Sequence, residues 1–209
     1  MDLYGYFRSS ASYRVRIGLN LKGLEYEYHP VNLLKGDQHG DDYRTLNPHG
    51  LLPTLNDGET SLTQSLAILE WLDETHPEPA LLPKAPEARA HIRALAQSIA
   101  SDIQPIQNLR VLQYLQAELK VSDEQKTQWI QHWIHLGFSA LEKQLRPSPF
   151  AAGDNPGLFE CCLLPQVYSA ERFGLDMTQY PKIQKITDAC NELPAFIKAH
   201  PSEQPDCIV

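Results

Sequence analysis

Apolar and polar positions alternate in two different ways along the first 80 residues. Four short segments have the alternating or aromatic pattern of half-buried strands, and they span residues 3–7, 26–31, 52–55 and 60–62. The apolar segment from Val15 to Leu21 predicts a helix that ends before Gly23, and a second helix is predicted from Ser65 to about His76. Asp57-Gly58 supplies a hairpin turn. The order β-α-β followed by β-β-α predicts a four-stranded mixed sheet with helices on it.

The rest of the chain has a different pattern. Residues 77–86 are rich in proline and weakly periodic, as a linker is. Beyond them almost every segment has helical spacing. Helices are predicted over 88–119 with a kink at Pro105, after the capping box Ser122–Gln125, over 157–172, and from Pro181 onward. We therefore expect an α/β domain over 1–80, a linker over 81–87 and an all-helical domain over 88–209.

Composition narrows the class of protein. The chain has 209 residues, of which 42% are hydrophobic and 21% charged, as in a soluble globular protein. It contains no apolar run of roughly 18 residues, and its start lacks the pattern of a secretory signal, so we expect a cytoplasmic protein that uses no membrane. The net charge of −8 disfavours nucleic acid as a partner. The four cysteines form no CxxC motif, and we expect inert thiols and no metal site.

A cluster of serines at the first strand–helix junction is the strongest chemical signal. Ser9, Ser10 and Ser12 lie at this junction, and because serine is a preferred N-cap, one interpretation is that Ser10 or Ser12 starts the first helix. The same position has a functional interpretation, because unpaired N–H groups at a helix N-terminus stabilise an anion such as a thiolate. No cysteine lies there, so the thiol would come from a ligand.

Two further segments fit the functional interpretation. A cis bond at Leu52-Pro53 would expose backbone groups to a peptide-like ligand, whereas an edge-strand proline in trans is the alternative. Gln64-Ser65 opens the next helix, and Ser65 is expected to be its N-cap and to hold a carboxylate. A small peptide thiol such as glutathione would satisfy all three segments.

The residues around this cluster resemble a known family. Ser9-Ser10-Ala11-Ser12-Tyr13-Arg14-Val15-Arg16-Ile17 is similar to the signature of zeta-class glutathione transferases. The resemblance covers nearly the whole chain. It includes residues 46–48, 52–55, 64–68, 103–109, 165–167, 170–173 and the tail segment Gln204-Pro205-Asp206. Such density of matches is typical of the maleylacetoacetate and maleylpyruvate isomerases within the class.

The resemblance implies a fold, a cofactor and a set of site residues. The expected fold is a thioredoxin-like α/β N-terminal domain with an all-α C-terminal domain, and the expected assembly is a homodimer. Glutathione is the implied cofactor, and its thiolate would be held by Ser9 and Ser10, the implied catalytic residues. The other residues expected to bind glutathione are Leu52, Pro53, Gln64, Ser65, Gln104 and Asn108. Gln104 and Asn108 have an alternative structural role, because polar side chains beside Pro105 can satisfy backbone groups freed by a kink.

The implied substrate is a small dicarboxylic keto acid with an activated cis double bond. Its two carboxylates require cations, and Arg8, Arg172 and Arg110 are the candidates, because arginine binds carboxylates through two hydrogen bonds. Each of these arginines could instead form a surface ion pair. Arg14 and Arg16 are expected to support the first helix structurally.

Two departures from the family pattern affect the prediction. Ala11 replaces the cysteine of the signature, which leaves the two preceding serines as the thiolate donors. Gly157 and Glu160 replace a Ser/Thr-x-x-Asp capping box, which affects local stability more than chemistry.

Three functions are consistent with these residues. The first is isomerisation of maleylacetoacetate, in tyrosine, phenylalanine or related aromatic catabolism, with maleylpyruvate as the alternative substrate. The second is a zeta-like glutathione transferase, peroxidase or dehalogenating enzyme that acts on other small electrophiles. The third is a non-catalytic interaction module with the same fold. A pair of arginines suited to a dianion favours the first.

Overall fold

The four segments predicted as strands form one mixed sheet in the computed structural model of the protein. The strands are β1 (Asp2–Gly5), β2 (Glu27–Pro30), β3 (Thr54–Asp57) and β4 (Thr60–Thr63), in the spatial order β2-β1-β3-β4. β1 and β2 are parallel and are joined by α1 (Ser10–Leu21), whereas β3 is antiparallel to both β1 and β4. Gly58 takes the positive φ of 58° that the β3–β4 turn requires.

The structure describes residues 1–146 and 148–207. Pro147 and residues 208–209 lie outside the described residues, and both fall within the domain that the sequence predicted over 88–209.

Alternation along the strands divides the sheet into two differently covered faces. On one face, the strand leucines form a core with α1 and α3 (Ser65–Thr75); its members are Leu3, Val15, Leu19, Leu55, Ile68 and Leu72. On the other, Tyr43 from α2 (Asp41–Leu46) contacts Tyr4, and its hydroxyl lies 2.9 Å from Thr54 Oγ1. The sequence did not predict α2, which is six residues long and buries only Tyr43.

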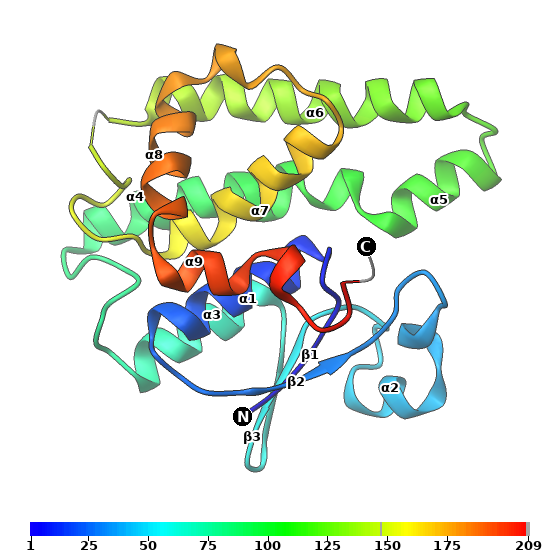
Figure 1. Ribbon diagram of the computed structural model, residues 1–209, viewed down its shortest axis with the longest axis horizontal. Helices are drawn as coiled ribbons and strands as arrows, with labels where there is room; N and C mark the ends of the chain where they lie inside the picture. Colours follow the sequence, from blue (N-terminus) through cyan, green and yellow to red (C-terminus); the bar gives the residue numbers. More distant parts are fainter. Residues whose placement is uncertain (147, 208–209) are drawn as a thin grey trace. The chain divides into compact units, whose positions relative to one another are not determined.

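A C-terminal segment packs against α1, as Figure 1 shows for the red α9 and the blue α1. Asn20 Nδ2 donates to Ala195 O at 2.9 Å, within α9 (Pro194–Ala199). The chain therefore divides into a first unit of Met1–Leu81 with Asn191–Val209 and a second unit of Leu82–Cys190. The prediction of one helical domain over 88–209 is wrong for its final segment, because the contacts that attach α9 to α1 are absent from any local pattern.

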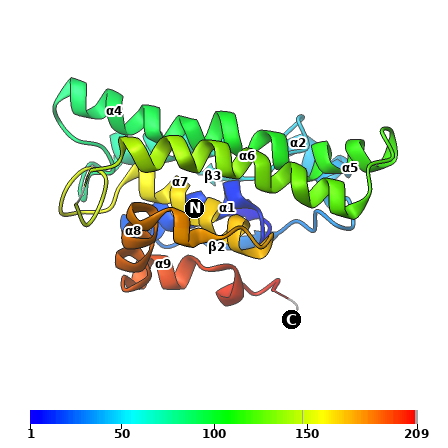
Figure 2. The ribbon, with the colours of Figure 1, turned by 90° about the horizontal axis from the view of Figure 1, so that it is seen from above.

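Helices make up the regular structure of the second unit. The predicted helix over 88–119 is divided into α4 (Pro86–Gln97), a π-helical turn η2 (Ser98–Ile103), a 3₁₀ turn η3 (Pro105–Gln107) and α5 (Leu109–Ala117). The predicted break at Pro105 is confirmed, and Trp129 Nε1 donates to Ile106 O at 2.8 Å beside it. Figure 2 shows α6 (Asp123–Gln144) running alongside α4 and α5, and α6 packs against η2 and η3.

The remaining helices of this unit are α7 (Leu158–Arg172), a 3₁₀ turn η4 (Met177–Gln179) and α8 (Pro181–Asn191). A further 3₁₀ turn follows α9 in the first unit, η5 (Pro201–Glu203), and η1 (Asp37–His39) precedes α2. None of the helices in the described part of the chain combines the length and apolar character needed to cross a bilayer.

Side chains form hydrogen bonds at the N-termini of α6 and α7 in the second unit. The predicted capping box of α6 is confirmed: Ser122 Oγ accepts from Gln125 N at 3.1 Å, and Gln125 Oε1 accepts from Ser122 N at 2.8 Å. At α7, where Gly157 offers no side chain, the carboxylate of Glu160 accepts from Gly157 N and Ala151 N, both at 2.8 Å. The Glu160 side chain therefore accepts two backbone hydrogen bonds at the start of α7, where Gly157 provides no Ser or Thr side chain as an N-cap.

Glu160 gives a prediction for the pH dependence of stability. Burial raises the pKa of its carboxyl group above the ordinary 4.5, so the folded chain holds this proton more tightly than the unfolded chain. The stabilising contribution is complete below pH 4.5 and is lost as the pH rises through the raised pKa. We expect the free energy of unfolding of the wild type to fall relative to that of Glu160→Gln as the pH rises above 4.5, in urea titrations at a series of pH values. A difference that grows in the opposite direction would contradict this.

Candidate active site

Ser9 lies at the junction of β1 and α1 and is the N-cap of that helix. Its backbone is extended, with φ −66° and ψ 115°, and its Oγ accepts a hydrogen bond from Ser12 N at 3.2 Å. A serine therefore caps α1 as predicted, but it is Ser9 and not Ser10 or Ser12, and this capping does not exclude the functional interpretation. A hydroxyl has one proton and two lone pairs, and the Ser12 bond uses one lone pair. Ser9 can cap α1 and still donate its proton to an anion.

Ser10 and Ala11 are the first two residues of α1, and both side chains are half-buried. The first N–H groups of a helix have no partner within the helix, so this turn presents backbone donors next to the Ser9 hydroxyl. Ala11 occupies the position of the family cysteine and adds only a methyl group. The junction offers hydroxyl and amide donors and no protein thiol.

The Arg16 side chain holds the loop between β1 and α1 through hydrogen bonds to the carbonyl groups of the loop. Its side chain is completely buried, and its guanidinium donates to Phe7 O at 2.9 Å, Tyr6 O at 3.5 Å and Ala199 O at 3.0 Å. Burial lowers the pKa of Arg16, an effect opposed by nearby acidic groups of which Tyr28 is the strongest. The sequence predicted a structural role for Arg16, but gave no signal for its partners, one of which is 183 residues away.

The peptide bond between Leu52 and Pro53 is cis, as the ligand-binding interpretation expected. Leu52 is half-buried and precedes the paired residues of β3, which begin at Thr54. The preceding carbonyl, Leu51 O, accepts from Tyr43 Oη at 2.6 Å and from Asn47 Nδ2 at 2.7 Å. These bonds hold the segment in place ahead of the strand.

The opening of α3 differs in detail from the prediction. Gln64, not Ser65, is the N-cap, and Ser65 is the first helical residue. Gln64 is exposed and has a φ of 69°, a conformation that is rare for residues other than glycine and that clusters at functional sites. Ser65 is buried, and its Oγ accepts from Arg14 Nη1 at 3.2 Å. Arg14 on α1 therefore supports the position of Ser65.

Strand register brings these three segments to one end of the sheet. Tyr4 near the end of β1 is paired with Thr54 at the start of β3, and Thr54 is paired with Thr63 at the end of β4. The loop to Ser9, the segment Leu52-Pro53 and the turn into α3 therefore begin side by side. The sequence predicted that the Ser9 junction, the backbone at Leu52-Pro53 and the start of the next helix lie in a row. Within the first unit, strand pairing brings these three segments to the same end of the sheet.

The arginine and amide candidates are distributed over both units. Arg8 in the first unit is half-buried, with its guanidinium 5.1 Å from the Phe7 ring centre and Nη2 donating to Tyr6 Oη at 3.4 Å. In the second unit, Arg110 is exposed on α5. Arg172 ends α7, exposed, with its guanidinium 4.6 Å from the Phe173 ring centre.

The amide candidates lie at the bend of the second unit. Asn108 is the N-cap of α5, and its Oδ1 accepts from Val111 N at 3.2 Å, which is the structural role that the sequence left open. Gln104 is half-buried at the junction of η2 and η3. Ser169 Oγ, one turn before the end of α7, donates to Gln107 Oε1 at 3.4 Å, so η3 and the last turn of α7 are joined.

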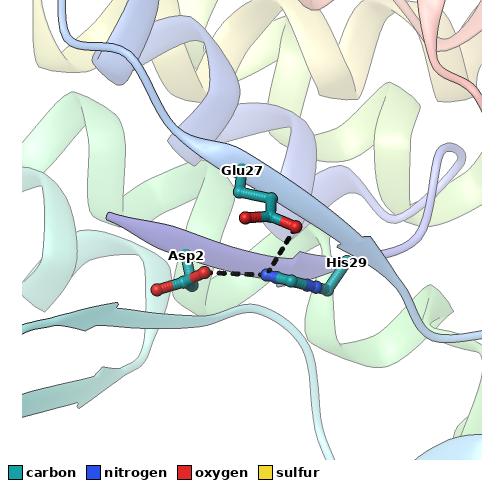
Figure 3. Close-up of side chains that lie close together, drawn as sticks. All are labelled: Asp2, Glu27 and His29. Atoms are coloured by element: carbon teal, nitrogen blue, oxygen red, sulfur yellow. Dashed lines mark hydrogen bonds and ion pairs between the residues drawn. The ribbon is translucent and has the colours of Figure 1, made fainter.

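One group of possible metal ligands exists among the described residues, and it lies at the other end of β1. Figure 3 shows the imidazole of His29 between two carboxylates, with its Nε2 2.8 Å from Asp2 Oδ1 and 4.0 Å from Glu27 Oε1. The group is partly to largely exposed and connects β1 to β2 through the hydrogen bond between His29 and Asp2. None of its three members is a residue predicted for the candidate site.

Three of the four cysteines are buried, as the prediction of buried small side chains or inert thiols expected. Cys161, Cys162 and Cys190 are buried, and burial raises the pKa of the Cys161 and Cys190 thiols. Cys207 is partly exposed in the C-terminal segment.

Comparison with known proteins identifies the family. Residues 3–80 match the family model described as the glutathione S-transferase N-terminal domain. A probable maleylacetoacetate isomerase of Vibrio cholerae is 52% identical over 208 residues, which cover 98% of this chain and 97% of that protein.

Solved structures agree with this assignment. A holo structure of maleylpyruvate isomerase, described as a bacterial zeta-class glutathione transferase, superimposes with a TM-score of 0.97 at 44% identity and covers 100% of both chains. A maleylacetoacetate isomerase of Anaeromyxobacter dehalogenans with glutathione in its active site has a TM-score of 0.89 at 45% identity, over 99% of this chain and 97% of that one. The chain therefore belongs to the zeta class of the glutathione transferase family, together with the maleylacetoacetate and maleylpyruvate isomerases.

Proposed function

We propose that the protein is a glutathione-dependent cis–trans isomerase that converts maleylacetoacetate to fumarylacetoacetate in the breakdown of tyrosine, phenylalanine or related aromatic compounds. The observation that carries the proposal is the strand register that places Ser9, Leu52-Pro53 and the start of α3 at one end of the sheet. These are three different kinds of site for a peptide thiol, and relatives of the same family carry glutathione in solved structures.

The residues at this end of the sheet fit glutathione. The Ser9 hydroxyl and the first N–H groups of α1 suit a thiolate, and the Leu52 backbone suits a peptide group. The Gln64-Ser65 turn suits a carboxylate, because it presents the N–H groups at the start of α3. Gln104 and Asn108 complete the proposed set of glutathione contacts. Because Asn108 Oδ1 caps α5, Asn108 would bind glutathione by donating its amide protons.

When bound, glutathione supplies a thiolate that adds reversibly to the electrophilic double bond, so that the resulting single bond can rotate before the sulfur leaves. The residues of the chain have two tasks in this reaction. Ser9, supported by Ser10 and the amides of α1, keeps the sulfur ionised. Arg8, Arg110 and Arg172 are the proposed ligands of the two substrate carboxylates. No electrons or protons are consumed overall.

Glutathione dependence tests the proposal directly. Purified protein should convert the cis acid to the trans acid only when glutathione is present, with the thiol recovered unchanged at the end. The rate is followed by the change in ultraviolet absorbance of the conjugated acid. Isomerisation at the same rate without glutathione would overturn the proposal.

Maleylpyruvate is the second candidate substrate, because the structural superposition with a maleylpyruvate isomerase is nearly complete. Both substrates have an activated cis double bond and two carboxylates, and they differ in the acyl group beyond the alkene. A comparison of kcat/KM for the two acids under the same conditions decides between them. A similar rate with a neutral chlorinated electrophile would favour the transferase or dehalogenase alternative.

Replacement of Arg172 by alanine tests the dianion site. We expect Arg172→Ala to raise KM for maleylacetoacetate by about 10- to 100-fold, since a charge-assisted hydrogen bond to a carboxylate contributes about 1.5–3 kcal/mol. The KM for a neutral chlorinated electrophile should remain unchanged. Arg146→Ala is a matched control, because Arg146 is also an exposed arginine of the second unit and is not a candidate ligand. An unchanged KM for the dianion would remove Arg172 from the substrate site.

We also propose that the protein acts in the cytoplasm as a homodimer, as the family resemblance implies. Light scattering on the purified protein should then give twice the chain mass of 23.6 kDa. A single-chain mass at micromolar concentration would contradict the dimer.

A further inference from the structure

The loop that leads to Ser9 is held by side chains on both sides. Tyr6 N donates to Ser12 Oγ at 3.4 Å, and Tyr6 O accepts from Ser9 N at 2.9 Å. Phe7 O accepts from Arg16 Nη2 at 2.9 Å. These partners are the N-cap Ser9 and two residues of α1, so they tie the loop to the helix that it precedes.

Phe7 N has a partner from a distant part of the chain. It donates to Asp206 Oδ2 at 3.0 Å, across 199 residues. Phe7 is thus held through its carbonyl by a buried guanidinium and through its amide by a carboxylate. Hydrogen bonds to ionised groups are stronger than those between neutral groups, so this is a firm attachment for a loop.

Asp206 is itself fixed in position. Tyr28 Oη on β2 donates to the same carboxylate oxygen at 3.3 Å, and burial raises the pKa of the Tyr28 hydroxyl, which therefore remains a donor. Just before it in sequence, Gln204 Nε2 donates to Lys198 O and to His200 O, both at 2.9 Å. The segment after α9 therefore reaches the Ser9 loop along a defined path.

We propose that Asp206 is a positioning residue of the thiolate site, whose carboxylate anchors the Phe7 amide and so sets where Ser9 and the first turn of α1 present their donors. The inference rests on the proposed glutathione-dependent function. Asp206 acts through the loop and requires no contact with glutathione or substrate. Asp206 thereby gives a positioning role at the thiolate site to a C-terminal segment that the sequence analysis placed in the helical domain.

The charge of Asp206 and its positioning role have opposite effects on the pKa of the bound thiol, so experiments can separate them. A negative charge near a thiolate disfavours the ionised form, whereas correctly placed donors favour it. Among the described residues, Tyr28 and Arg16 are ionisable groups that interact electrostatically with the Asp206 carboxylate. Asp206→Asn keeps an acceptor for Phe7 N and removes the charge, whereas Asp206→Ala removes both.

We expect Asp206→Ala to lower kcat for isomerisation by about tenfold, the equivalent of 1.4 kcal/mol. Asp206→Asn should restore most of this loss. The pKa of bound glutathione, measured from thiolate absorbance against pH, should rise in Asp206→Ala and should not rise in Asp206→Asn. Asn20→Ala is the matched control, because Asn20 also ties the C-terminal segment to α1 but does not touch the loop; it should keep the wild-type kcat and thiol pKa.

Hydrogen exchange provides a readout that does not depend on catalysis. The Phe7 amide should lose protection in Asp206→Ala and keep it in Asp206→Asn and Asn20→Ala. Unchanged protection in Asp206→Ala, or equal losses of kcat in Asp206→Ala and Asn20→Ala, would overturn the inference. If the wild type isomerises without glutathione, the proposed function fails, while the Phe7 exchange still decides whether Asp206 anchors the loop.

Discussion

Replacement of Ser9 by alanine is expected to lower kcat for isomerisation by about 100- to 1,000-fold, which is the typical cost of removing one preorganised donor to a reacting anion. The affinity for glutathione should change much less, because the amides of α1, the Leu52 backbone and the start of α3 remain. Steady-state kinetics gives kcat, and isothermal titration with glutathione gives the dissociation constant. Equal losses in both would mean that Ser9 only binds or caps.

Ser122→Ala is the matched control for the capping role of Ser9. Both serines are N-caps whose Oγ accepts from a backbone N–H three residues on, at 3.2 Å for Ser9 and 3.1 Å for Ser122. Each alanine variant should lose about 1 kcal/mol of stability. Only Ser9→Ala should lose kcat, so a parallel loss in Ser122→Ala would show that the effect came from helix fraying.

Replacement of Arg16 by alanine is expected to lower the free energy of unfolding by about 3–5 kcal/mol, because three backbone carbonyls lose buried donors. Those carbonyls belong to Tyr6, Phe7 and Ala199, so the variant weakens both the Ser9 loop and the attachment of α9. Urea unfolding measures the loss, and hydrogen exchange at the amides of α1 and α9 assigns it to the first unit.

Two further variants keep the Arg16 prediction decisive. Arg16→Lys retains a charge but cannot donate in three directions from one planar group, so its loss should be smaller than that of Arg16→Ala. Arg44→Ala removes an exposed arginine at the end of α2 and should change stability by less than about 0.5 kcal/mol. A cost below about 1 kcal/mol for Arg16→Ala would contradict the structural role described here.

The parts of the fold that the sequence predicted are those with a local physical cause. Alternation marked the four strands, Asp57-Gly58 marked the hairpin, and Ser122 with Gln125 marked the start of α6. The break at Pro105 was predicted because proline lacks an N–H group. The π-helical turn before it was not, because it depends on packing with other helices in the second unit.

The candidate site was predictable to the same extent. Serines before a helix, a proline before a strand and a polar turn before the next helix were visible locally, and their row at one end of the sheet follows from strand order. The sequence predicted Ser65 as the N-cap of α3, one residue too late, because a glutamine side chain gives no indication of the positive φ that Gln64 adopts. One partner of Arg16, Ala199, and one partner of Phe7, Asp206, lie more than 180 residues away and could not be read from any local pattern.

The first unit is completed by residues that follow the entire second unit in the chain. During synthesis on a ribosome, α1 and the strands emerge early, but the Asp206 carboxylate that binds Phe7 and the Ala199 carbonyl that binds Arg16 emerge only after Leu82–Cys190 has been translated. A nascent chain halted before α9 would therefore have a sheet but an incompletely held Ser9 loop. Because domains otherwise fold in order of their emergence, the catalytic junction is expected to be the last part of this protein to mature.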